Sequence, residues 1–242
     1  MLQNAREKEE ARKKALLRIE KQKETLVQDI SQLWINASES GDFLIVCRNQ
    51  EFPCHRAILS ARFAILSTVH NLANDNFLGR LHLLVALPPV CLRQGAGGIY
   101  FGSFQKINTH TNRWTMRDAE GDDAEPLAVR DMLEYIYTSR ISKDGIKERP
   151  GDLLDLAMQY QLPDLGEACK EAIIEGLTPQ NAVVSLIQLD KYSGEKSEEE
   201  WKNKVLDFIK KNANAVVKGE HWKTFVKNYE DLVTEIVTCL AN

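Results

Sequence analysis

Apolar residues near the start of the chain recur at every third or fourth position. The series is Leu16, Ile19, Lys23, Leu26, Ile30 and Leu33, at successive intervals of 3, 4, 3, 4 and 3 residues. This spacing predicts a helix with a heptad seam along one side and a lysine in one core position. Two to three heptads are too few for a stable free coiled coil, so we expect the seam to pack on a folded body. The alternative is an amphipathic first helix that docks only on its own domain.

The period changes from helical to β-like at Gly41. The runs Phe43–Cys47 and Glu51–Cys54 are separated by three polar residues and predict a β-hairpin. Helical spacing follows from His55 to Leu66, and Arg113 to Met116 is interpreted as a short strand.

The rest of the chain predicts helices. They cover about Leu127–Tyr137, Gly151–Tyr160, Leu162–Glu175, Pro179–Leu189 and Glu198–Asn212, with shorter pieces around Trp222 and Leu232. Thr178 and Pro179 have the residue types of a helix N-cap and first turn. The expected fold class is therefore α/β in the α+β sense, with a small sheet and an all-helical tail. Residues from about 71 to 110 have no clear period, which is unusual inside a compact domain.

Charge and composition exclude several classes of protein. The 242 residues have a net charge of -4 and a sequence pI near 5.8, which argues against nucleic acid as a partner. Residues 1–25 are net +3 and predict a charged helix, interpreted as a solvated face or alternatively as a basic nucleic-acid or nuclear-import arm. The longest apolar run, Leu81–Leu92, is too short to span a membrane. The charged N-terminus and five scattered cysteines favour an intracellular protein of the nucleus or cytoplasm.

The residue pattern contains no constellation that supports an enzyme. Cys54 and His55 are adjacent but lack the paired spacing of a zinc site, and Cys169 lies in a helical pattern typical of core packing. The run Gly95–Gly98 lacks the Lys-Ser/Thr pair of a phosphate loop. We therefore expect neither catalysis, nor a cofactor, nor a bound metal.

Several motifs resemble the BTB/POZ domain of the speckle-type POZ proteins. The opening motif comprises Asp42–Val46 and Glu51–Arg62, and later motifs comprise Leu133–Thr138 and Asp152–Leu162. Leu26–Trp34 resembles the first helix of that domain, and Leu177–Ala182, Asp207–Ile209 and Trp222–Lys223 resemble the helices after it. In place of the MATH domain that precedes the BTB in those proteins, we expect the charged helix.

The resemblance implies a dimeric binding protein rather than an enzyme. BTB domains of this kind form two-fold dimers, and many recruit the cullin-3 ubiquitin ligase scaffold. In the speckle-type proteins the helical three-box/BACK-like region extends the cullin contact and promotes higher assembly. By position, the dimer face would comprise Leu26, Ile30, Leu33 and Ile58. Asp42 and His55 occupy recurrent family positions, interpreted as a structural pair at the strand–helix junction.

The chain departs from the family pattern where a hydrophobic-x-Glu element contacts cullin-3. Those positions correspond to Asn74 and Asn76, so cullin-3 binding is expected to be weakened. An atypical insertion follows, at about residues 76–110, either a genuine loop or a translated intron. The predicted domains are a charged helix over 1–25, a BTB/POZ domain over 26–175 and a three-box/BACK-like region over 176–242. The expected function is a dimeric adaptor that brings an unknown substrate to a cullin-3 ligase for ubiquitination and degradation. The alternatives are a scaffold that binds no cullin and a defective gene product.

Overall fold

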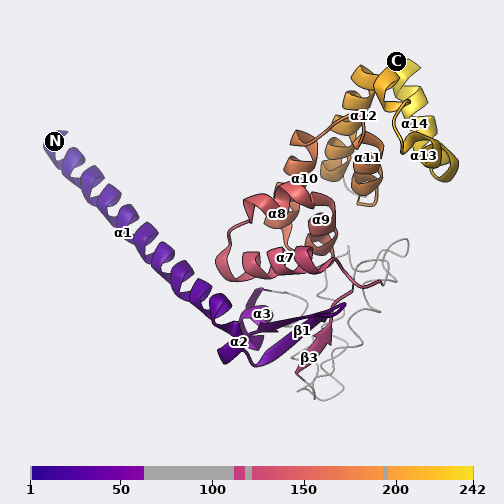
Figure 1. Ribbon diagram of the computed structural model, residues 1–242. Helices are drawn as coiled ribbons and strands as arrows, with labels where there is room; N and C mark the ends of the chain where they lie inside the picture. Colours follow the sequence, from indigo (N-terminus) through magenta and orange to yellow (C-terminus); the bar gives the residue numbers. More distant parts are fainter. Residues whose placement is uncertain (1, 63–111, 118–121, 193–195, 242) are drawn as a thin grey trace, which may run out of the picture. The chain divides into compact units, whose positions relative to one another are not determined.

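The computed structural model describes residues 2–62, 112–117, 122–192 and 196–241, and within these ranges the side chains of 2–7 and 196–198 are not described. The elements from the N-terminus to β3 are α1 (Leu2–Ile35), α2 (Ala37–Ser40), β1 (Phe43–Cys47), β2 (Gln50–Cys54), α3 (Arg56–Arg62) and β3 (Arg113–Thr115). Helices follow: α7 (Pro126–Thr138), α8 (Lys143–Glu148), α9 (Pro150–Gln159), α10 (Pro163–Glu175), α11 (Ala182–Asp190), α12 (Lys196–Val216), α13 (Trp222–Asn228) and α14 (Glu230–Ala241) (Figure 1).

The chain forms two compact units. The N-terminal unit comprises Met1–Ser142 together with Gln159–Gln161, and the C-terminal unit comprises Lys143–Met158 and Leu162–Asn242. The predicted fold class is confirmed, because a small mixed sheet with flanking helices is followed by an all-helical tail.

The sheet of the N-terminal unit has the strand order β2-β1-β3. β1 and β2 form the predicted antiparallel hairpin, in which Ile45 lies opposite Phe52. β3 pairs with β1 in parallel, with Ile45 opposite Trp114. Ile45 and Trp114 are both buried, so the centre of the sheet belongs to the core.

Helix α7 supplies the largest share of that core. Its buried residues include Met132, Leu133 and Ile136, at the spacing that places one face of a helix inside a protein. Both α1 and α3 pack against this helix, and Leu59 of α3 is buried. Trp114 of β3 makes an edge-to-face contact with Tyr160 at 5.5 Å between ring centroids. The sheet and three helices therefore share one apolar centre.

The C-terminal unit is a set of helices linked by an ion-pair cluster as well as by apolar packing. Lys202 of α12 is 12% exposed, and its Nζ lies 2.8 Å from Asp190 Oδ1 and 2.6 Å from Glu235 Oε2. These carboxylates belong to α11 and α14, so one ammonium group connects three helices. Burial lowers the pKa of Lys202, but its hydrogen bonds to the two carboxylates outweigh that and raise it above its ordinary value.

Some predicted boundaries differ from the structure. The predicted helix start at Pro179 is wrong, since α11 begins at Ala182. Residues 178–181 instead form a turn in which the Thr178 N–H donates to Asn181 Oδ1 and the Asn181 N–H donates to the Thr178 hydroxyl. The charged segment and the following seam form one continuous helix, α1. The expected insertion at 76–110 lies outside the described residues.

We predict that Lys202→Met lowers the free energy of unfolding of the C-terminal unit by about 1 to 2 kcal/mol, because two partly exposed carboxylates lose a charge-assisted partner. Urea denaturation followed by circular dichroism measures the change. Lys210→Met, an exposed lysine on the same helix, is the control and should have an effect within about 0.5 kcal/mol. Since the folded pKa is raised, the stabilisation should be present at neutral pH and lost only as alkaline pH passes the folded pKa. Equal effects of the two substitutions would contradict this account.

Candidate protein-interaction surface

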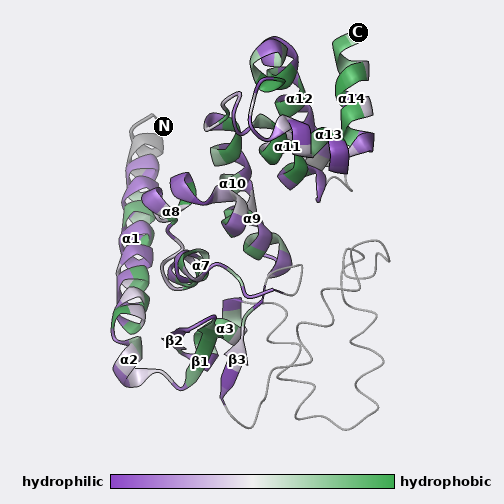
Figure 2. Cartoon of the chain, turned by 45° about the vertical axis from the view of Figure 1, so that its right-hand side comes forward, coloured by the Kyte–Doolittle hydropathy of each residue, from purple (hydrophilic) through white to green (hydrophobic). Residues whose placement is uncertain are grey.

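The seam predicted from the sequence lies on α1 and is largely open to solvent. The exposed fractions of its leucine and isoleucine side chains are 55% for Leu16, 48% for Ile19, 59% for Leu26 and 38% for Leu33, while Ile30 is half-buried. Successive residues of a helix are turned by about 100°, so these positions share one side of α1. In Figure 2, α1 is mostly hydrophilic and carries hydrophobic segments along its length. Isolated exposed apolar residues are ordinary, but a continuous stripe indicates an interaction surface.

A neighbouring face of α1 is held by its own chain. Val27, Ser31 and Trp34 are half-buried and recur at intervals of four and three residues, and α1 packs against α7. The ring centroids of Trp34 and of Tyr137 on α7 lie 5.3 Å apart. This packing fixes α1 on the N-terminal unit and leaves Leu26 and Leu33 facing outward.

Tyr137 also holds the junction between β2 and α3. Its hydroxyl oxygen accepts a hydrogen bond from the His55 backbone N–H at 2.7 Å and lies 3.1 Å from His55 Nδ1. The other ring nitrogen, Nε2, lies 2.9 Å from the Ser40 hydroxyl at the end of α2. Burial raises the pKa of Tyr137, so its hydroxyl keeps its proton and can donate it to Nδ1.

The direction of donation in this network gives His55 a structural role. If Tyr137 donates to Nδ1, then Nε2 carries the imidazole proton and donates to Ser40 Oγ. The Ser40 hydroxyl in turn donates to the Asn36 carbonyl at 3.0 Å. A histidine that donates to a serine cannot take its proton, so this assignment does not activate Ser40 as a nucleophile.

Asp42 lies at the same junction but has a different partner. Its Oδ1 accepts a hydrogen bond from the Arg56 backbone N–H at 2.7 Å, which satisfies a free donor at the start of α3. Ile58 is half-buried on α3, a separate helix from the seam residues, and both α1 and α3 pack against α7. At the other end of α3, Arg62 Nη2 donates to Ser139 Oγ at 2.9 Å, next to the end of α7.

Cys54 and Cys169 are buried and have the chemistry of packing residues. Burial raises the pKa of Cys54 and of Cys169 to about 12, so each remains a thiol at neutral pH. Within residues 2–62, 112–117, 122–192 and 196–241, no group of three or more His, Cys, Asp or Glu side chains is placed to hold a metal ion. None of the helices described there is long and apolar enough to cross a membrane.

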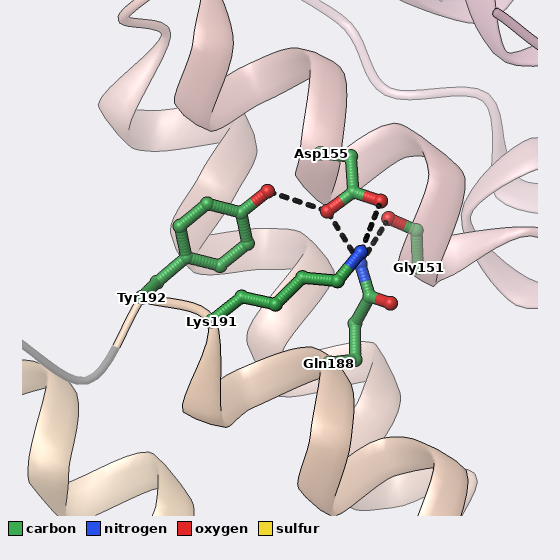
Figure 3. Close-up of polar contacts among 5 residues, drawn as sticks. All are labelled: Gly151, Asp155, Gln188, Lys191 and Tyr192. Atoms are coloured by element: carbon green, nitrogen blue, oxygen red, sulfur yellow. Dashed lines mark hydrogen bonds and ion pairs between the residues drawn. The ribbon is translucent and has the colours of Figure 1, made fainter. Parts of the chain in front are cut away.

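A polar cluster in the C-terminal unit connects α9 to the end of α11 (Figure 3). Asp155 of α9 accepts from Gln188 Nε2 at 2.6 Å and from the Tyr192 hydroxyl at 2.5 Å, and its second oxygen faces Lys191 at 3.5 Å. Gln188 Nε2 also lies 3.1 Å from the Gly151 carbonyl. The polar groups of the cluster are hydrogen-bond partners of one another, so the cluster links α9 to the end of α11.

The last helix presents a second apolar stripe. Val233 is half-buried, whereas Val237 and Leu240 are exposed, at intervals of four and three residues along α14 (Figure 2). The C-terminal unit therefore has an apolar surface of its own.

The sequence predicts the seam on α1, but it does not predict the side-chain contacts that hold α1 and its neighbours in place. Tyr137 and Asp155 lie in motifs that resemble the family, without an assigned role, and no sequence pattern distinguishes Ser40. Their partners lie between 15 and 82 residues away in sequence, a separation at which no local pattern signals the pairing. Asn74 and Asn76 lie outside the described residues.

We predict that Tyr137→Phe lowers the free energy of unfolding of the N-terminal unit by about 1 to 2 kcal/mol. The ring contact with Trp34 is kept, but the His55 N–H loses its acceptor. Urea denaturation followed by tryptophan fluorescence measures the effect. Tyr229→Phe, at an exposed tyrosine, is the control and should change little. If Tyr137→Phe were as stable as the parent protein, the hydroxyl would not be what holds this junction.

Comparison with known proteins agrees with this architecture. Residues 102–177 match the family model described as BTB/POZ domain, a segment that contains β3 and α7 to α10. Three relatives from Mus musculus are similar along most of the chain. TD and POZ domain-containing protein 4 is 27% identical over 219 residues, TD and POZ domain-containing protein 1-like is 25% identical over 218, and TD and POZ domain-containing protein 1 is 24% identical over 218. Each alignment covers 90% of this chain and 48% of the relative.

The chain thus spans about half the length of the curated relatives it matches. BTB/POZ domains are protein-interaction modules, and a mixed fold with an open apolar stripe on its first helix suits that role. Together the family match over residues 102–177 and the relatives show that this chain is similar to BTB/POZ domain proteins.

Proposed function

We propose that this protein is a homodimeric, non-catalytic adaptor of the speckle-type POZ kind, which pairs with a second copy through α1 and recruits other proteins. The observation that carries the proposal is the exposed seam Leu16, Ile19, Leu26 and Leu33 on a helix that the chain itself holds in place. A two-fold interface needs an apolar, self-complementary patch, and the seam has both properties. Ile58 on α3 is the further residue assigned to this face from the family resemblance.

The proposed dimer is tested by Leu26→Asp combined with Leu33→Asp. Both side chains are exposed in a single chain, so the variant should fold, but a dimer would bury unpaired carboxylates at a cost of several kcal/mol. We expect a folded monomer by multi-angle light scattering and a parent-like circular dichroism spectrum.

The matched control is Leu17→Asp combined with Ile35→Asp. These leucine and isoleucine side chains are 65% and 66% exposed and lie on the opposite side of α1 from Leu26. The control should remain dimeric. A dimeric seam variant, or a control that dissociates equally, would refute the assignment of the interface to the seam.

The proposed adaptor role extends to cullin-3 with weakened affinity. The family's apolar anchor and glutamate are replaced by Asn74 and Asn76. Truncating an anchor of that kind costs about 2 kcal/mol, and a neutral hydrogen bond is roughly half as strong as a charged one. A combined loss of around 3 kcal/mol corresponds to over a hundredfold in affinity.

We therefore predict weak or undetectable binding of the unmodified chain to the cullin-3 N-terminal domain, and a gain of affinity from Asn74→Met combined with Asn76→Glu. Isothermal titration calorimetry measures both. Tight binding by the unmodified chain would show that cullin-3 is contacted by other residues. If the double change gave no gain, these two positions would not be the contact.

The second candidate function is a BTB scaffold that joins partners without a cullin. The two asparagines favour it, whereas the long helical tail favours the cullin adaptor, since that tail is shared with cullin-recruiting proteins of this kind. Under the adaptor proposal the chain acts in the nucleus or cytoplasm and supports ubiquitination and proteasomal degradation of a captured substrate. A pull-down with the cullin-3 N-terminal domain separates the two functions, because the scaffold would retain dimerisation without any cullin.

A further inference from the structure

The seam on α1 contains charged residues whose positions restrict how two copies can pair. Continuing the heptad toward the N-terminus from Leu16 puts Arg12 and Glu9 in core positions, in addition to Lys23. α1 is helical without interruption from Leu2 to Ile35, so all these positions lie on the same side of one helix. Two-fold pairing of two such helices can be parallel or antiparallel.

Parallel pairing would place like charges opposite one another in three layers. Each core residue would face its own copy, so Glu9 would meet Glu9, Arg12 would meet Arg12, and Lys23 would meet Lys23. Like charges opposed across an interface are strongly unfavourable, which disfavours the parallel arrangement.

Antiparallel pairing removes these repulsions in one register. In this register the residue numbers of two opposed positions always add to 49. Leu16 then faces Leu33 of the second copy, Ile19 faces Ile30, and Lys23 faces Leu26. The lysine stem can then cover the leucine while its ammonium reaches solvent. Arg12 and Glu9 would face positions 37 and 40 of the second copy, beyond the end of its α1 at Ile35.

Neighbouring antiparallel registers fit less well. A shift of one heptad in one direction would put Ile30 against Arg12 and Leu33 against Glu9. A shift in the other direction would leave Leu16 and Ile19 beyond the end of the second α1. The register with the sum of 49 covers every leucine and isoleucine of the seam, including the exposed Leu16 and Ile19 that lie outside the dimer face expected from the family.

We infer that two copies of this chain pair antiparallel along α1, so that the N-terminal half of each seam covers the C-terminal half of the other. The inference rests on the proposed homodimer and adds its orientation, its register and two further interface residues, Leu16 and Ile19. The paired stretch runs from Leu16 to Leu33, or about 26 Å of helix at 1.5 Å per residue. Such an arrangement ties the N-terminal half of α1 to the folded body of the second copy.

Cysteine cross-linking distinguishes the orientations. In a background with Cys91→Ser and Cys239→Ser, three proteins are compared: Leu16→Cys, Leu33→Cys and the double variant. Each is treated with a short bis-maleimide and analysed by denaturing electrophoresis, after light scattering of the untreated sample. In the antiparallel dimer, two residues at position 16 are about 26 Å apart, since 17 residues separate positions 16 and 33 along the helix. The same spacing keeps the two cysteines of one double-variant chain from reacting with each other.

We expect the double variant to form a covalent dimer and each single variant to remain as single chains. A second double variant, Leu17→Cys with Ile35→Cys on the opposite face, is the control and should not cross-link. Cross-linking by either single variant would establish a parallel dimer, which overturns the antiparallel register but keeps the proposed homodimer. Dimers by light scattering with no cross-link in any variant would place the interface elsewhere and also overturn the inference. If the protein that carries only Cys91→Ser and Cys239→Ser is a monomer by light scattering, the proposed homodimer is overturned together with the antiparallel inference.

Discussion

The contacts of Tyr137 hold together three pieces of the N-terminal unit that are far apart in sequence. Its ring packs on Trp34 near the end of α1. Its hydroxyl oxygen accepts a hydrogen bond from the backbone N–H of His55, the residue before α3. Tyr137 itself belongs to α7, whose Met132, Leu133 and Ile136 are buried in the core. Because burial keeps the hydroxyl protonated, one phenol can serve as acceptor for the backbone and donor to the imidazole. The position of α1 on this unit depends on that arrangement.

A fixed α1 has consequences for its outward face. A helix held through Val27 and Trp34 cannot rotate to bury Leu26 and Leu33 against its own unit. An apolar stripe kept in water is unfavourable by about 25 cal/mol per Å², and covering it with a second copy removes that cost. The charges at Lys23, Arg12 and Glu9 then select among the possible pairings, in the way that polar core residues select register in coiled coils. The proposed dimerisation through α1 therefore rests on how the helix is supported as well as on its sequence.

Local patterns predicted most of the elements and little of their connections. The hairpin, the short strand β3 and the face of α7 follow from period and turn residues, and the structure has them within one or two residues. The parallel pairing of β3 with β1 was not predicted. The start of α11 was missed because Thr178 and Asn181 satisfy each other in a turn, which has the same residue types as a helix cap.

The connecting residues could not be predicted for a physical reason. Asp155 meets Gln188, His55 meets Tyr137, and Lys202 meets Asp190 and Glu235 only after the helices have packed. Nothing in the local spacing distinguishes these from the many other charged and polar residues of the chain. The seam was recognisable because its signal, the 3-4 spacing of apolar residues, is carried entirely within one helix.

In the proposed dimer, α1 is the surface through which two copies meet. Amide hydrogen exchange along α1, measured as a function of protein concentration, tests it most directly, because amides at an interface are protected only while the partner is bound. Exchange between residues 16 and 33 should slow as the concentration rises through the dissociation constant, while exchange within α12 should stay constant. Rates in α1 that do not depend on concentration, in a sample whose sedimentation gives the mass of one 27.5 kDa chain throughout, would contradict the account.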